Sequence, residues 1–254
     1  MILDQLYNSR EQGLKSLAVL IDPDKTREPE QVLKLVDIAN ENYLDYFLVG
    51  GSLLTAPTLS MVITTLKSNT SIPVVLFPGS NMYIDTNADA ILFLSLISGR
   101  NPELLIGQHV VAAPIIRNSP LEVLPTGYML VSSDRATSAS YMSNTTPIPA
   151  DKYSIAASTA MAGEMLGLKL LYMDAGSGGV PISTRMISKV RRSVDLPLII
   201  GGGINTVQRA MDTLEAGADT IVIGNAIEDN PGFLIELSEK MYDLNKEKRG
   251  LNIG

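Results

Sequence analysis

Glycine-rich segments follow two consecutive apolar runs in the C-terminal part of the chain. Gly201–Gly203 come directly after Leu198–Ile200, and Gly224 and Asn225 come directly after Thr220–Ile223. Glycine lets backbone N–H groups approach an anion closely, and the N-terminus of a following helix adds a favourable dipole. Each segment alone is equally compatible with a tight turn, but the pair at neighbouring strand ends predicts a phosphate site.

A carboxylate ends the apolar run Leu170–Asp174, and a loop of glycine and serine follows it. Asp174 at that position is a candidate general base. The loop N–H groups and the Ser177 hydroxyl are candidates for binding the same phosphate. The alternative is structural, with Asp174 capping a turn and Tyr172 packed in the core.

Two carboxylates and a lysine follow the first apolar run of the chain. Asp22, Asp24 and Lys25 could hold a hard cation and a polyphosphate, because Mg²⁺ typically takes one or two protein carboxylates and completes its shell with water and substrate phosphates. Ser52, which follows Gly50-Gly51, is a candidate second oxygen ligand. The structural alternative is an Asp-Pro turn with Asp24 as a helix N-cap, which leaves Asp22 as the functional residue.

Short apolar runs alternate with amphipathic segments along the whole chain. Strands are expected at 15–22, 46–49, 73–77, 90–96, 127–132, 170–174, 198–200 and 220–223, and helices at 28–40, 58–67, 104–111, 153–166, 183–193, 205–216 and 232–244. Continuous apolar strands are typical of parallel sheets that are buried on both faces. Eight of them over 254 residues favour a single α/β domain, 1–254, with the (β/α)8 TIM barrel fold. A doubly wound sheet is the alternative.

In a barrel, the positions just after the strands share one rim, so the candidate residues above are expected to meet there. Only the twelve residues 78–89 separate the third and fourth strands, which predicts an abbreviated or missing helix after strand 3. The polar stretch 132–151 is expected to be a functional loop or irregular structure. The tail Lys246–Gly254 is polar and expected to be frayed.

Composition narrows the possible functions. The formal net charge of −7 argues against a nucleic-acid partner. The absence of cysteine removes disulfides and thiolate chemistry, and a single histidine, His109, makes a zinc site improbable and is expected to be structural. The N-terminus does not resemble a signal peptide, and no apolar run approaches the roughly 20 residues of a membrane span, so a cytoplasmic enzyme is expected. No nucleotide-binding motif is present.

Taken in order, these motifs resemble the geranylgeranylglyceryl phosphate synthase family, whose members are prenyltransferases that join sn-glycerol 1-phosphate to a long prenyl diphosphate through an ether bond. The resemblance covers nearly the whole chain and rests on 20–25, 50–52, 172–178, 201–204 and 224–225. It implies Mg²⁺ at Asp22 and Ser52. It also implies a substrate site formed by Tyr172, Met173, Asp174, Ala175, Gly176, Ser177, Gly178, Gly202, Gly203, Gly224, Asn225 and Lys25.

The same resemblance implies that Asp174 is the base that accepts the proton of the attacking hydroxyl. Family members commonly have Glu there, so a water is a candidate bridge across the shorter side chain. The resemblance further implies an apolar groove for a geranylgeranyl or longer tail, with candidates in Leu76–Ile84 and Ser95–Ile97. A homo-oligomer and a transient contact with a membrane surface are also implied.

Two other functions are compatible with the phosphate motifs. A barrel isomerase or aldolase that acts on a sugar phosphate shares the glycine-rich phosphate site, but usually needs a lysine or a second acid–base residue on the rim. A non-catalytic barrel that binds a phosphate ligand is the third possibility, and the presence of Asp22 and Asp174 argues against it.

Overall fold

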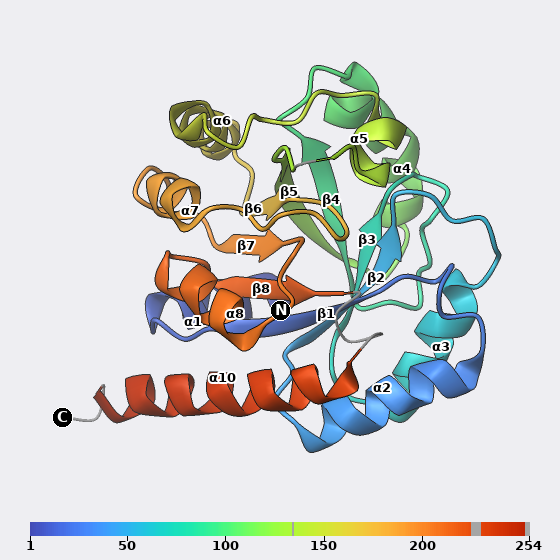
Figure 1. Ribbon diagram of the computed structural model, residues 1–254. Coiled ribbons are helices and arrows are strands. Elements are labelled where there is room, and N and C mark those ends of the chain that lie inside the picture. Colours follow the sequence, from blue (N-terminus) through green and yellow to red (C-terminus); the bar gives the residue numbers. More distant parts are fainter. Residues whose placement is uncertain (134, 225–229, 252–254) are drawn as a thin grey trace.

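The computed structural model describes residues 1–133, 135–224 and 230–251. Eight parallel strands follow one another in sequence order around a closed barrel, and β1 pairs with β8 to complete it (Figure 1). The predicted TIM barrel is therefore confirmed. The strands are β1 Ser16–Ile21, β2 Tyr46–Gly51, β3 Val74–Pro78, β4 Ala90–Leu96, β5 Glu122–Leu130, β6 Leu170–Asp174, β7 Leu198–Gly201 and β8 Thr220–Ile223.

Helices surround the barrel. They are α1 Ile2–Glu11, α2 Pro29–Glu41, α3 Leu59–Asn69, the π-helix η1 Glu103–Gly107, α4 Gln108–Arg117, α5 Ser138–Ser143, α6 Tyr153–Met165, α7 Thr184–Arg191, α8 Val207–Glu215 and α10 Pro231–Leu251. Helix α1 lies at the N-terminal end of the strands and α5 lies at the mouth. Among the described residues, no helix is long and apolar enough to cross a bilayer.

Helix α2 does not begin at Asp24, the N-cap that the structural alternative predicted. Glu28 is the N-cap, and it forms a reciprocal capping box with Gln31. Asp24 therefore does not cap this helix, because its carboxylate binds a different loop.

The connection from β3 to β4 contains no helix, as predicted. Residues 79–89 cross directly from one strand to the next, so no helix of their own covers this side of the barrel. The covering element comes after β4, where η1 runs into α4, and both together are longer than the predicted helix 104–111. His109, Ala112 and Ile116 form the buried face of α4.

Side chains of each strand alternate between two apolar layers, because successive strand residues point to opposite faces. In β6, Leu170 and Tyr172 belong to the inner cluster, whereas Leu171 and Met173 belong to the outer cluster against the helices. This alternation places Asp174, the next inward position, at the C-terminal mouth of the barrel. The alternation of side chains along β6 therefore turns the candidate base, Asp174, toward the inside of the barrel.

Helix α1, which the sequence pattern did not predict, packs on the inner apolar cluster through Ile2 and Leu6. The Glu122 carboxylate at the start of β5 accepts hydrogen bonds from the backbone N–H groups of Ile2 at 2.6 Å and Leu3 at 2.9 Å. A carboxylate at a helix N-terminus satisfies unpaired donors and complements the helix dipole. Glu122 therefore anchors α1 at the N-terminal end of the strands.

The C-terminal helix α10 is also longer than predicted. Figure 1 shows it as a single helix lying along the barrel, and it contacts α2 and α8. The expected fraying from Lys246 is wrong for residues 246–251, which are helical. The Lys248 ammonium donates a hydrogen bond to the Gly13 carbonyl at 2.6 Å, and the Asn245 amide binds both the N–H and the carbonyl of Lys15, each at 2.8 Å. These contacts hold the last turns against the start of β1.

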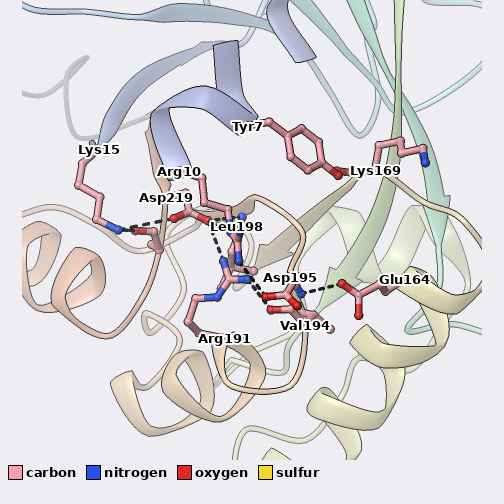
Figure 2. Close-up of polar contacts among 11 residues, drawn as sticks. Tyr7, Arg10, Lys15, Glu164, Lys169, Arg191, Val194, Asp195, Leu198 and Asp219 are labelled. Carbon is pink, nitrogen blue, oxygen red and sulfur yellow. Dashed lines mark hydrogen bonds and ion pairs between the residues drawn. The ribbon is translucent and has the colours of Figure 1, made fainter. Parts of the chain in front are cut away.

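A buried carboxylate joins distant parts of the chain at the end of the barrel opposite the mouth. Figure 2 shows Arg10, Lys15 and Arg191 converging on Asp219, which precedes β8. The Asp219 carboxylate lies 2.8 Å from Arg191 Nη1 and 3.6 Å from Lys15 Nζ, and it accepts the Leu198 N–H at 2.9 Å. Burial lowers the pKa of Lys15, and the negative charge of Asp219 opposes that effect. The group is a structural ion cluster that ties α1, β1, α7 and β8 together.

Candidate active site at the mouth of the barrel

A cavity of about 1040 Å³ opens at the C-terminal ends of the strands. Polar and glycine residues from the loops after β1, β2, β6, β7 and β8 form one part of its wall. Apolar residues of β3, β4, η1 and α4 form the other part. The polar wall includes Asp22, Lys25, Ser52, Asp174, Gly176, Ser177, Gly178, Gly202, Gly203 and Gly224. The structure therefore brings most of the predicted site residues together.

Asp174 lines this cavity and is only 9% exposed. Its Oδ2 accepts a hydrogen bond from the Tyr128 hydroxyl at 2.5 Å, and its Oδ1 accepts one from the Gly176 N–H at 2.7 Å. Burial raises the pKa of this carboxyl above its usual value, and the two hydrogen bonds partly oppose the shift. The side chain is thus held in one orientation and binds a proton more tightly than an ordinary aspartate.

The glycines after β7 are required by their backbone geometry. Gly202 and Gly203 have φ angles of +84° and +74°, a region that other residues rarely adopt. A Cβ placed on Gly202 would lie 2.7 Å from Asp174 Oδ1 and 2.8 Å from the nitrogens of Ala175 and Gly176. The loops after β6 and β7 therefore pack backbone against backbone, as a site for a small anion requires.

The loop after β1 contains two carboxylates with different roles. Asp24 accepts hydrogen bonds from the Thr55 N–H at 2.8 Å, the Thr55 hydroxyl at 2.8 Å and the Ala56 N–H at 3.0 Å, so it holds the loop after β2. Asp22 Oδ1 accepts the Asp24 N–H at 3.0 Å. Burial raises the pKa of Asp22. Both carboxylates line the cavity, and Asp24 is the one that is bound by the loop after β2.

The residues around Asp22 fit a cation that keeps most of its own ligands. Asp22 and Ser52 line the same wall of the cavity, and Asp22 Oδ1 would lie 3.5 Å from a Cβ placed on the intervening Gly51. Within the described ranges, no group of three or more His, Cys, Asp or Glu side chains could hold a metal ion by itself. One carboxylate and one hydroxyl match Mg²⁺ bound mainly by water and a diphosphate.

The apolar part of the cavity extends between β4 and α4. Its wall includes Phe77, Ile84, Ile91, Leu92, Phe93, Leu94, Leu96, Leu104, Ala112 and Ile116. His109 lies among them, 3.1 Å from the Ser95 hydroxyl and edge-on to the Phe93 ring. Burial lowers the pKa of His109, which favours the neutral imidazole in this apolar wall. This agrees with the structural role expected for the only histidine.

Some predicted residues lie outside the cavity wall. Met173 and Ala175 belong to the outer cluster and point toward the helices, so only their backbone is available to a substrate. In the predicted groove segments, Phe77 to Asn81, Ile84 and Leu96 line the cavity, whereas Ser95 and Ile97 do not. Asn225 lies outside the described residues.

The sequence reasoning missed the residues that support Asp174 and its loop. Tyr128 lies inside β5, and its ring packs with Phe77 and Tyr172 at centroid distances of 5.7 and 5.5 Å. From the polar stretch after β5, Arg135 donates a hydrogen bond to the Gly178 carbonyl, and Thr137 lies against Gly176. For the stretch after β5, its length and polarity were the only indication of a functional role. Tyr128 gave no indication, because a tyrosine within an apolar strand is usually part of the hydrophobic core.

Comparisons with known proteins agree with this geometry. The chain is 51% identical over 235 residues to a geranylgeranylglyceryl phosphate synthase of Spirosoma linguale, covering 92% of this chain and 94% of that protein. It is 40% identical over 237 residues to the protein of the same name from Pyrococcus furiosus, covering 92% of each. Both relatives carry the name of the family that the motifs resemble.

Solved structures give the same result. The crystal structure of (S)-3-O-geranylgeranylglyceryl phosphate synthase from Thermoplasma acidophilum, in complex with substrate sn-glycerol-1-phosphate, matches with a TM-score of 0.86 and 29% identity over 97% of both chains. An N-acetylmannosamine-6-phosphate 2-epimerase from Clostridium perfringens, with a TM-score of 0.54 and 13% identity, shares the fold alone. The PcrB family model matches residues 10–247. The chain therefore belongs to the PcrB family.

Proposed function

We propose that this protein is a prenyltransferase that forms an ether bond between the 3-hydroxyl of sn-glycerol 1-phosphate and a long-chain prenyl diphosphate, with release of diphosphate. One observation carries the proposal: a buried, hydrogen-bonded carboxylate, Asp174, shares one cavity with glycine-rich anion loops and a long apolar wall. The names of the relatives and the substrate named for the Thermoplasma structure support the same reaction.

The glycerol phosphate binds at the loops after β6, β7 and β8 in this proposal. Backbone N–H groups near Gly202 and Gly203, together with Ser177, Gly178 and Gly224, surround its phosphate, and Tyr172 forms the floor beneath it. Asp174 receives the proton of the attacking hydroxyl. Its raised pKa favours that role, because a carboxylate that binds its proton more tightly is a better base.

The prenyl diphosphate occupies the remaining part of the cavity. Its tail lies along the apolar wall between β4 and α4, and its diphosphate lies near Lys25, Asp22 and Ser52. Asp22 and Ser52 are the residues that would hold Mg²⁺, which when bound neutralises charge on the leaving diphosphate. An isomerase or aldolase for a sugar phosphate would have no use for so long an apolar wall.

The surroundings of the enzyme form part of the proposal. We place it in the cytoplasm as a homo-oligomer that touches a membrane surface transiently. Ile106 of η1 and Val110 and Ile115 of α4 are 61%, 65% and 52% exposed. Exposed apolar side chains on consecutive elements are typical of interaction surfaces. Light scattering coupled to size exclusion would measure the oligomeric state directly.

Transfer of label into an organic phase tests the reaction. Purified protein is incubated with radiolabelled sn-glycerol 1-phosphate, Mg²⁺ and prenyl diphosphates of several lengths, and sn-glycerol 3-phosphate serves as the stereochemical control. We expect transfer that requires Mg²⁺, favours the sn-1 isomer and identifies the preferred tail length. A folded protein that binds sn-glycerol 1-phosphate but transfers label with no tail length would overturn the proposal.

A further inference from the structure

Tyr128 lies where the two parts of the cavity meet. It faces the cavity from β5, donates a hydrogen bond to Asp174 Oδ2 at 2.5 Å and packs edge-on against Phe77 of the apolar wall at 5.7 Å. Its side chain is less buried than those of Asp174 and Tyr172. Tyr128 therefore contacts both the carboxylate and the cavity in which the ether bond has to form.

Direct access to Asp174 is restricted on both oxygens. Oδ1 accepts the Gly176 N–H at 2.7 Å and is covered by the backbone around Gly202, while Oδ2 accepts the Tyr128 hydroxyl. A proton transfer needs a heavy-atom distance of about 3 Å. An aspartate side chain is one methylene shorter than that of glutamate. The Asp174 carboxylate therefore reaches less far into the cavity than a glutamate at this position would.

Building on the proposed function, we propose that Tyr128 is a catalytic residue that passes the proton of the glycerol hydroxyl to Asp174. As the hydroxyl oxygen bonds to C1 of the prenyl group, the bond between C1 and the diphosphate oxygen breaks and its electron pair leaves with the diphosphate. The hydroxyl proton moves to the Tyr128 oxygen, and the phenolic proton of Tyr128 moves to Asp174 Oδ2. Tyr128 ends unchanged, and Asp174 ends as the neutral acid.

The electrostatics of the pair are consistent with this exchange. Burial and the neighbouring Asp174 charge raise the pKa of Tyr128 far above its usual value, so a free tyrosinate is unfavourable. A concerted exchange avoids that species, because the phenol gains one proton while it loses the other. The 2.5 Å separation matches the short distance of an O–H···O⁻ hydrogen bond, which is aligned for transfer.

A double-mutant cycle between Tyr128 and Asp174 tests the proposal. In the wild type, Tyr128→Phe keeps the ring and removes the hydroxyl, so we expect kcat to fall by about 100-fold or more, the usual size of a lost acid–base step. The KM for sn-glycerol 1-phosphate should change by less than about threefold, because the phosphate loops are untouched. In an Asp174→Glu background the longer carboxylate reaches the hydroxyl itself, so the same Tyr128→Phe change should cost less than about fivefold.

Tyr46→Phe is the matched control, since it removes a phenol from the same inner cluster at the opposite end of the barrel. It should leave kcat unchanged. The relay is refuted if Tyr128→Phe costs the same factor in both backgrounds, or if it raises only KM. If Asp174→Glu is inactive, a single-turnover proton inventory on the wild type decides instead: two protons in flight give a curved plot, and a linear plot excludes the relay. An inactive wild type would overturn the proposed function rather than the relay.

Discussion

Asp45 couples the stability of the barrel to pH. Its Oδ2 accepts the Leu17 N–H at 2.8 Å, and its Oδ1 accepts the Tyr43 hydroxyl at 3.2 Å, which in turn accepts a hydrogen bond from the Asn245 amide at 3.1 Å. Burial raises the pKa of Asp45 from its ordinary 3.8 to about 6, and the two hydrogen bonds oppose that shift. The native protein therefore binds the Asp45 proton more tightly than the unfolded chain does.

The size and sign of the effect follow from this shift. Between pH 4 and pH 6 the unfolded chain has lost the proton while the native state retains it, so the Asp45 contribution falls as pH rises through that window. A shift of about two units corresponds to on the order of 2–3 kcal/mol of unfolding free energy, at about 1.4 kcal/mol per unit. Above about pH 7 the contribution no longer changes.

Asp45→Asn removes the titration and preserves the shape, since the amide oxygen still accepts the Leu17 N–H and its nitrogen can donate to Tyr43. Urea unfolding of both proteins from pH 4 to pH 8 gives the difference in unfolding free energy at each pH. We expect the variant to gain on the wild type by about 2–3 kcal/mol between pH 4 and pH 7. Asp37→Asn, at an exposed aspartate of α2, supplies the reference curve. A difference curve for Asp45→Asn that is flat with pH would refute the reasoning.

Three further predictions concern the cavity. Asp22→Ala should abolish Mg²⁺-dependent transfer without lowering Tm. Asp24→Ala should instead lower the free energy of unfolding by about 1–3 kcal/mol, because it leaves the N–H groups of the loop after β2 without their acceptor. Activity assays and thermal unfolding of both variants test this pair, and normal turnover in Asp22→Ala would contradict the metal assignment. Asp174→Asn should lower kcat by about 100-fold or more with little change in the affinity for sn-glycerol 1-phosphate, and a pure binding defect would make Asp174 a positioning residue. Gly202→Ala should lower kcat/KM by about 100-fold, because its Cβ would lie 2.7 Å from Asp174 Oδ1. Gly13→Ala is the control, since Gly13 has a φ of +69° with open space around it and therefore reports the backbone strain alone. Equal activity of the two variants would contradict the packing argument.

The barrel and most of the active-site rim could be predicted from the sequence because both depend on local pattern. Buried parallel strands are continuous apolar runs, and the residue just after each run must lie at the mouth. The short link after β3 could likewise be predicted, because twelve residues leave little room for a helix. That residues 1–254 form a single domain stays a prediction.

Other features depend on contacts between distant segments, which a single sequence does not reveal. Helix α1 has little apolar character of its own, and it is anchored by Glu122, about 120 residues away. Asp24 looked like a helix cap because a proline-containing turn precedes α2, yet its partners come from the loop after β2. Tyr128 looked like core because its partner, Asp174, lies on the next strand.

The pairing of β1 with β8, and the Asp219 cluster beside it, also has a consequence for how the chain is made. The partner strand of Ser16–Ile21 ends at Ile223, so the first strand keeps one open edge until about 200 further residues have been synthesised. At about 5–20 residues per second, that interval lasts roughly 10–40 s. The arginine and lysine side chains of the first 15 residues meet their buried carboxylate only at the end of it. The barrel can therefore close only after β8 has been made, with α10 still to follow, and truncation before β8 leaves an open sheet edge of the kind that promotes aggregation.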